Sequence, residues 1–181
     1  MRITSLSLVL ATTALLASLG ARGDNAAPTA APAANPLDTI PDTMPFDLPY
    51  GAPIGLERAN QAIAAAMAEA RLHNWKLDIA VVDSGANLVA FQRMDGAQLA
   101  SIAVAEHKAR ASAQFRRETK VFENAVQVSH YNYVLSLDGV VASRGGIPLV
   151  EAGKLIGAIG CSGGSGSQDE VACKAGAATV K

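Results

Sequence analysis

The sequence predicts an α+β domain, in which one antiparallel sheet built from two hairpins is flanked by helices. Three observations lead to this prediction. Apolar residues recur every three or four positions around 56–75 and 98–117, which is the period of a helix with one buried face. Two pairs of short apolar runs, at 79–91 and 147–161, are each separated by turn-forming residues, as in hairpins. Helices and hairpins therefore alternate along the chain, and such elements pack around one sheet.

The composition fits one globular domain without a nucleic acid partner. Of the 181 residues, 50% are apolar and 17% are charged, which is enough apolar surface for one sizeable core. Basic residues number 15 and acidic residues 16, so no basic excess is present to neutralise phosphates.

The first 23 residues have the pattern of a secretory signal peptide. Arg2 precedes an apolar run over Ile3–Leu19, and small residues follow that run. The run is short and rich in Ala, Ser and Thr, so we expect no membrane span in the mature protein, and an uncleaved anchor is the alternative. The sequence thus predicts a periplasmic or secreted protein.

A tether and a folded domain are expected after this leader. Residues 24–53 contain seven of the eight prolines among many alanines, and proline at this density removes backbone donors and restricts its neighbours. We therefore expect an extended tether over 24–52 and a folded domain over 53–181.

The first helix and the first hairpin open this domain. In the hairpin, the run Ile79–Val82 is expected to pair with Leu88–Phe91 across a turn of Asp, Ser, Gly and Asn. The helix before it begins near Leu56, because apolar residues three or four apart share one face: Leu56, Ala59, Ile63, Ala66, Met67 and Ala70.

An alanine-rich second helix is predicted over 98–117. Its charged residues, Lys108 among them, are expected to form a polar face. Segment 118–139 has no clean period and is predicted to be mostly loop with one short helical piece. The inward residues of the helix are expected to be Leu99, Ile102, Ala105 or Ala109, and Ala113.

The second hairpin and a last helix close the chain. Ile147–Val150 and Leu155–Cys161 are expected to pair, and Pro148 indicates an irregular start or a sheet edge. Ser167, followed three residues later by Glu170, fits a capping box that opens the last helix. The Gly/Ser run before it lacks the lysine of a phosphate-binding loop, so a structural turn is favoured over an anion site.

Three segments together resemble the GlcG/HbpS family of small haem-binding proteins, which is related to the haem-binding C-terminal domain of some cobalamin adenosyltransferases. They read IAVVDSGANLVAFQRMDGA, HKARASAQFRRET and GGIPLVEAGKLIGAIGCSGGSGSQDEVACKAG. The resemblance covers residues 54–181. It implies a profilin-like sheet with flanking helices, assembly into dimers or larger homo-oligomers and, in some members, extracellular haem binding tied to redox sensing.

On this resemblance, histidines and nearby tyrosines are the candidate haem ligands, since haem iron accepts an imidazole or a tyrosinate. His130 lies in SHYNY next to Tyr131 and is chemically best suited, with an ordinary loop that packs its aromatic rings as the alternative. His73 closes the first helix, where a cation also interacts favourably with the helix dipole. His107 lies among charged residues of the second helix, and a solvated face is its alternative.

Arginines are the candidate partners for haem propionates or for a small carboxylate ligand. They are Arg93, which stands with Asp95 in QRMDGA, and Arg116 with Arg117 beyond the second helix, and a solvated charged face is the alternative. Cys161 and Cys173 could form a disulfide in an oxidising compartment or pack as two thiols, and the sequence leaves both open. Covalently attached haem is excluded because Cys-x-x-Cys-His is absent. No motif predicts a catalytic residue.

The sequence therefore predicts an exported protein that binds haem or a similar tetrapyrrole and acts as a carrier, sensor or accessory protein. One alternative is a small enzyme or accessory subunit that binds an organic ligand at an interface between subunits. Another is a purely structural oligomer, whose surface would lack a pocket polar enough to orient any ligand.

Overall fold

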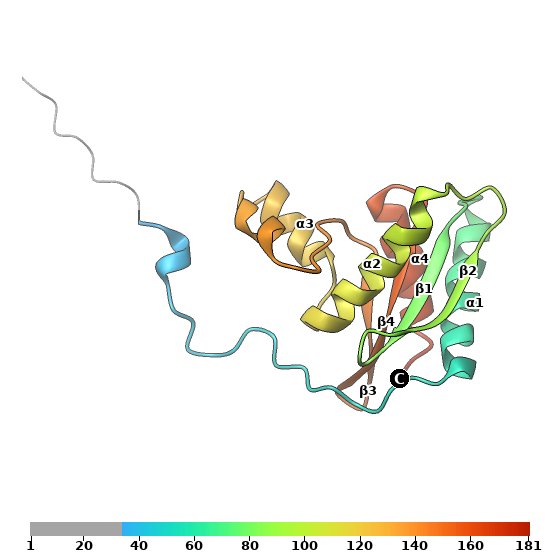
Figure 1. The fold of residues 1–181 in the computed structure, drawn as a ribbon, viewed down its shortest axis with the longest axis horizontal. Coiled ribbons are helices and arrows are strands. Elements are labelled where there is room, and N and C mark those ends of the chain that lie inside the picture. The colour runs from blue at the N-terminus through green and yellow to red at the C-terminus, as the bar shows by residue number, and fades with distance from the viewer. Residues whose placement is uncertain (1–33) are drawn as a thin grey trace, which may run out of the picture. The chain divides into compact units, whose positions relative to one another are not determined.

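A computed structural model describes residues 34–181, which Figure 1 shows as a coloured ribbon. The predicted signal peptide and the first part of the predicted tether lie outside the described residues. The chain divides into a unit that ends at Ile40 and a unit over Pro41–Lys181. In the first unit, Asn35 caps a single 3-10 turn, η1 (Pro36–Asp38). Within residues 34–181, no helix combines the length and the apolar character that crossing a bilayer requires.

The second unit holds the predicted helices and hairpins in the predicted order. Segment 118–139 contains a short helix and a 3-10 turn, as the missing period indicated. The elements are α1 (Leu56–Leu72), β1 (Asp78–Asp83), β2 (Leu88–Arg93), α2 (Ala100–Phe115), α3 (Lys120–Gln127), η2 (Asn132–Ser136), β3 (Gly146–Glu151), β4 (Lys154–Ser162) and α4 (Gly166–Ala177).

The four strands form one antiparallel sheet in the order β2-β1-β4-β3. Each hairpin supplies one outer and one central strand, and the hairpins join where Ala80 of β1 lies opposite Gly160 of β4. Pro148 lies in β3 at an edge of the sheet, which is the position that tolerates a missing backbone donor. The α+β prediction is confirmed.

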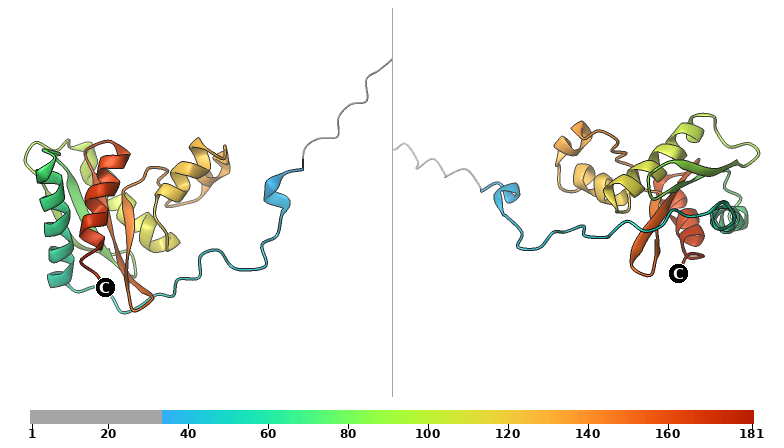
Figure 2. Two further views of the ribbon diagram at one scale, coloured as in Figure 1. Left: turned by 180° about the vertical axis from the view of Figure 1, so that it is seen from behind. Right: turned by 60° about the horizontal axis from the view of Figure 1, so that its bottom comes forward.

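Helices cover both faces of this sheet, as the two views in Figure 2 show. Helices α1 and α4 lie on one face, where Ile79, Val81 and Ile159 belong to the larger core. Helix α2 lies on the other face over Ala80 and Val82. It lies so close that a side chain at Gly160 would collide with the Ala105 carbonyl.

The predicted inward face of α2 is wrong in part. Leu99 is 74% exposed and precedes the helix, and the buried positions include Ser101 and Lys108. The cause is that small residues, rather than large apolar ones, let α2 approach the sheet. Leu56 at the start of α1 is likewise exposed instead of inward.

The predicted cap of the last helix is also wrong, by two residues. The N-cap of α4 is Ser165, whose hydroxyl accepts a hydrogen bond from the Gln168 N–H while the Gln168 side chain accepts one from the Ser165 N–H. Glu170, predicted to complete the capping box, is instead buried and paired with lysines and an arginine. Glutamine satisfies a capping box as well as glutamate does.

A segment ahead of α1 adds to the domain. Tyr50 forms a parallel bridge with Leu155 at the start of β4, and its hydroxyl donates to the Gln114 carbonyl at the end of α2. The Arg117 guanidinium lies 3.2 Å from the centre of the Phe46 ring. Residues 46–50 therefore contact the end of α2 and the sheet.

Candidate functional site

A cavity of about 320 Å³ lies where the C-terminal end of α1 meets the end of β2. Its volume is at the lower end of the range for small-molecule pockets. The lining residues come from the last turns of α1, from the linker into β1, from the last residue of β2 and from the two residues after it: Met67, Arg71, Asn74, Trp75, Lys76, Arg93, Met94 and Asp95.

Two chain reversals build this cavity. After α1, Asn74 adopts a left-handed conformation with φ of 61°, and the Trp75 N–H donates to the Ala70 carbonyl at 2.9 Å. After β2, the chain turns at Gly96, which has φ of 80° and faces the Lys76 side chain. The two turns therefore lie side by side, and their side chains line a common space.

Positive charge dominates the lining. Arg71, Lys76 and Arg93 contribute three cations, and Asp95 contributes one carboxylate. Within residues 34–181, none of these three cations belongs to an ion pair. Cations without a protein partner attract an anionic ligand, and arginine binds carboxylates in a bidentate geometry.

The rest of the lining is apolar apart from Asn74, and an imidazole stacks against it. Met67, Trp75 and Met94 pack against the main core. The His73 ring stacks on Trp75, with 4.4 Å between the ring centres and 19° between the planes. His73 Nε2 lies 3.1 Å from Glu69 Oε1. A carboxylate on one ring nitrogen fixes the orientation of an imidazole and leaves Nδ1 for a metal.

A buried carboxylate lies next to the cavity. Asp78 opens β1 with an exposed fraction of 0%, directly opposite Arg93 of β2. Neither of its oxygens has a hydrogen-bond partner among the described residues. Burial raises the pKa of Asp78, and the positive charge of Arg93 opposes that shift.

Comparison with known proteins places this geometry in a family. Residues 54–178 match the family model described as "Haem degrading protein HbpS-like". The chain belongs to the HbpS-like family. The resemblance inferred from the sequence motifs is thereby confirmed.

Relatives of this HbpS-like chain are found in enteric bacteria. Protein GlcG of Escherichia coli strain K12 is 39% identical over 106 residues, which cover 59% of this chain and 78% of the relative. An uncharacterised 15.0 kDa protein from the dhaT-dhaS intergenic region of Citrobacter freundii is 36% identical over 119 residues, which cover 64% of this chain and 84% of the relative.

Solved structures share the fold. A double mutant of HbpS from Streptomyces reticuli is 28% identical with a TM-score of 0.67, covering 85% of this chain and 99% of that one. The crystal structure named PduOC:Heme Complex is 26% identical with a TM-score of 0.65, covering 72% of this chain and 96% of that one.

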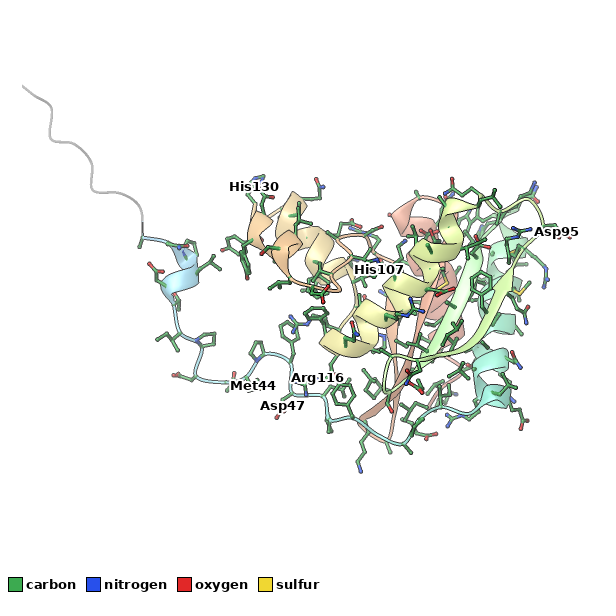
Figure 3. The ribbon with its side chains drawn as sticks, viewed as in Figure 1. Met44, Asp47, Asp95, His107, Arg116 and His130 are labelled. Carbon is green, nitrogen blue, oxygen red and sulfur yellow. A yellow bond between two sulfur atoms is a disulfide. The ribbon has the colours of Figure 1, made fainter. Side chains whose placement is uncertain are left out.

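The structure places one predicted ligand residue of this HbpS-like chain in the cavity lining and a second against a lining residue. Arg93 lines the cavity and His73 stacks on its Trp75 wall. Figure 3 shows His107 on α2 and His130 at the outer end of the α3–η2 segment, both away from Asp95 at the cavity rim.

The remaining candidates also lie outside the cavity. His107 and His130 are exposed. Tyr131 lies beside Tyr133, with 6.3 Å between their ring centres. Arg116 donates a hydrogen bond to the Leu48 carbonyl, which places it at the C-terminal end of α2.

Sequence reasoning missed six of the lining residues, which carry no motif of their own because the cavity joins two turns that are distant in the sequence. They are Met67, Arg71, Asn74, Trp75, Lys76 and Met94. One signal was available: QRMDGA was singled out for Arg93 and Asp95, and Met94 stands between them. Among residues 34–181, no group of three or more His, Cys, Asp or Glu is arranged to hold a metal ion.

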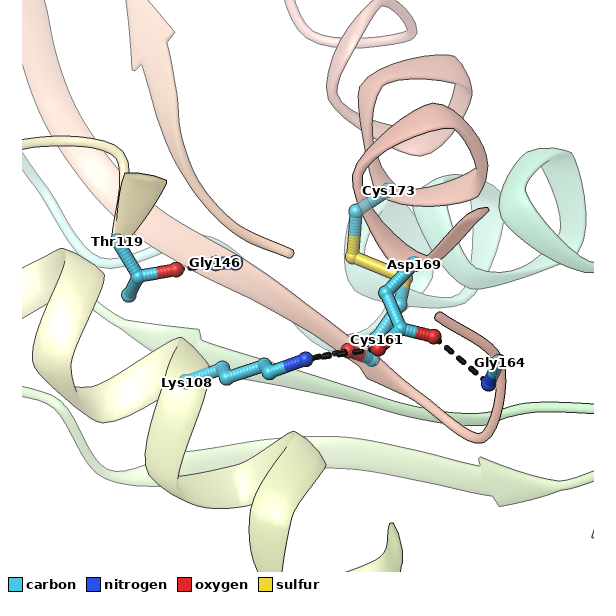
Figure 4. Close-up of a disulfide and its surroundings, with 7 residues drawn as sticks. All are labelled: Lys108, Thr119, Gly146, Cys161, Gly164, Asp169 and Cys173. Carbon is cyan, nitrogen blue, oxygen red and sulfur yellow. Dashed lines mark hydrogen bonds and ion pairs between the residues drawn. A yellow bond between two sulfur atoms is a disulfide. The ribbon is translucent and has the colours of Figure 1, made fainter. Parts of the chain in front are cut away.

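A second polar cluster lies inside the domain, between α2 and α4, and Figure 4 shows it beside the disulfide. Lys108 Nζ lies 2.8 Å from Asp169 Oδ2 and donates to the Cys161 carbonyl at 3.2 Å. The Gly164 N–H donates to the other Asp169 oxygen. Burial raises the pKa of Asp169, and Lys108 opposes that shift. Cys161 and Cys173 form a disulfide, one of the two alternatives that the sequence left open.

Proposed function

We propose that this protein binds haem through the cavity at the end of α1. The observation that carries the proposal is the arrangement of His73, which is stacked on Trp75 and oriented by Glu69 beside three cations without ion-pair partners. Support comes from the description of the HbpS-like family and from the likeness to a structure solved as a haem complex.

The residues at this cavity fit the chemical needs of haem. His73 would supply an axial nitrogen through Nδ1, because Nε2 is engaged by Glu69. Arg71, Lys76 and Arg93 would bind the propionates. The apolar lining would receive an edge of the macrocycle, and a second copy of the chain would cover the remainder in the predicted homo-oligomer. Haem would supply a redox-active iron, while the chain supplies binding and orientation.

A titration of the purified protein with haemin tests this proposal. We expect a sharp Soret band that saturates at a fixed ratio of haemin to protein. We expect His73→Ala to weaken haemin binding at least about tenfold, and a tenfold change in affinity equals in free energy a shift of one pKa unit. His107→Ala and His130→Ala are the matched controls, since both side chains are exposed and distant from the cavity, and neither is expected to change the band. Loss of the band in His130→Ala alone would instead support the ligand that the sequence favoured.

A second candidate function is the binding of a small organic acid in the same cavity. The volume of about 320 Å³ favours it, because a compact carboxylate would be enclosed without help from another subunit. Trp75 is the single tryptophan of the chain and lines the cavity, so its fluorescence reports occupancy. Saturable quenching by an aromatic carboxylate such as benzoate, without a Soret response to haemin, would favour this function.

We propose further that the protein is exported and acts outside the cytoplasm as a haem carrier, sensor or accessory protein. The signal-peptide pattern of the first 23 residues supports this proposal. The disulfide between Cys161 and Cys173 supports it independently, because disulfides persist in oxidising compartments and are rare in the cytosol.

A further inference from the structure

Asp78 is a buried carboxylate without a partner among the residues that the structure describes. Both of its oxygens lack hydrogen bonds, and its exposed fraction is 0%. It alternates along β1 with Ala80 and Val82, so it lies on the face of the sheet that α2 covers. An isolated charge in such a place is costly unless it is paired or neutralised by a proton.

Arg93 is the charged group beside it. The two residues face each other across the β1–β2 ladder, so their Cβ atoms lie close together on one face of the sheet. Within residues 34–181 no ion pair joins them, and Arg93 instead lines the cavity. Arg93 lies at the end of an outer strand, where its long side chain can turn towards Asp78 or towards the cavity.

We propose that Asp78 makes anion binding in the cavity depend on pH, because its ionised carboxylate draws Arg93 away and its protonated form releases Arg93 to the ligand. Asp78 is thus a positioning residue that acts through Arg93. The inference rests on the proposed function, since it concerns the regulation of the same cavity.

Among the described residues, no other charged side chain near Asp78 can act as Arg93 does. Lys76 lies two residues before Asp78 in the linker ahead of β1, whereas Arg93 is directly opposite Asp78 in the strand ladder. The buried polar groups on the elements packed against Asp78 are uncharged or engaged: Ser162 opposite it on β4, Ser101 and Ser112 of α2, and Lys108 of α2, which is paired with Asp169. The titratable His107 of α2 is exposed.

The sign of the effect follows from the charges. Burial raises the pKa of Asp78 above its usual value, so this carboxyl takes up a proton at a higher pH than a solvated aspartate does. Protonation removes one negative charge beside Arg93. Affinity for a carboxylate ligand should therefore rise as the pH falls.

Quenching of Trp75 fluorescence by mesoporphyrin, a metal-free porphyrin with two propionates, measures this without an axial ligand. We expect its affinity for the wild-type protein to rise about threefold to tenfold as the pH is lowered from about pH 8 while its propionates are still ionised, since one pKa unit of coupling equals a tenfold change. The isosteric Asp78→Asn variant should bind mesoporphyrin at every pH as tightly as the wild-type protein does at low pH.

Two further variants separate the possible outcomes. Arg93→Gln should bind mesoporphyrin weakly at every pH, because the guanidinium that Asp78 controls is absent. This variant still tests the inference if Asp78→Asn fails to fold. Asp95→Asn, which removes the exposed acid at the rim, should keep the pH dependence. Equal, pH-independent affinities in the wild type and in Asp78→Asn would overturn the inference alone. Absence of quenching at every pH would show that the cavity does not bind the porphyrin, which would contradict the proposed function and the inference that rests on it.

Discussion

Lys108 and Asp169 carry opposite charges in a part of the domain that water hardly reaches. Their side chains are 2% and 3% exposed, and 2.8 Å separates Nζ from Oδ2. Removing two charges from water costs several kcal/mol each, which their attraction offsets only when the remaining hydrogen bonds are made. Here the Cys161 carbonyl and the Gly164 N–H complete the set. The pair thus depends on both partners.

Removing one member of this pair should cost far more than removing both. We expect Asp169→Asn to lower the free energy of unfolding by about 3 to 5 kcal/mol, because the Lys108 ammonium then lies buried without a counter-charge. The double variant Lys108→Met with Asp169→Leu should unfold within about 1 kcal/mol of the wild type, since a well-packed apolar pair is often neutral. Urea unfolding measures both. Equal losses in the two proteins would show that packing, rather than charge, sets the cost.

Residue burial was the part of the fold that sequence patterns predicted least well. The 3.6-residue period indicated that α2 has a buried face, but it did not place Lys108 on that face. The burial of Lys108 can be explained only from the packing of α2 on the sheet. Lys108 lies three residues after Ala105 and next to Ala109, the two residues that pack on Gly160. A charged residue in a small-residue stripe has a partner elsewhere in the chain, and that partner is 61 residues away.

At the scale of the element, the start of α4 offers a direct comparison of two serines. Ser165 caps the helix in the structure, whereas Ser167 was the predicted cap and is the second residue of the helix. Ser165→Ala should destabilise the protein by about 1 kcal/mol, because a helix-terminal N–H then loses its acceptor. Ser167→Ala should have almost no effect, since that side chain is exposed. Thermal unfolding of the two variants decides between the caps, and a larger loss in Ser167→Ala would contradict this assignment.

Strands and hairpins were predictable because their signals are local. The runs Ile79–Val82 and Leu155–Cys161 lie inside strands β1 and β4, and each hairpin turn carries its own glycine. The pairing of β1 with β4 joins residues about eighty positions apart, and no local pattern indicates it. It follows from the family resemblance and from the need to bury both hairpins against one set of helices.

At the scale of the whole molecule, the site was predicted in part. Arg93 and His73 were chosen from residue chemistry; Arg93 lines the cavity, and His73 stacks on the lining residue Trp75. His130 with Tyr131 formed the most suitable cluster in the sequence, yet neither residue lines the cavity at the end of α1, and His130 is exposed. A ligand site needs concavity as well as chemistry, and concavity arises only when distant turns meet.

The disulfide connects the stability of the whole domain with its proposed export. Cys161 and Cys173 are both buried, and they join β4 of the sheet to α4, which packs on α1. Closing a loop with a sequence separation of 12 restricts the unfolded chain, so we expect reduction to lower the free energy of unfolding by about 2 to 4 kcal/mol. Urea unfolding with and without dithiothreitol measures this loss. The double variant Cys161→Ser with Cys173→Ser should have the stability of the reduced protein, and dithiothreitol should not change it.

The proposed export is tested by expressing the full chain in a bacterium. The oxidised form should be recovered from the periplasm with its N-terminus near residue 24. Recovery of only reduced, full-length protein from the cytoplasm would contradict export.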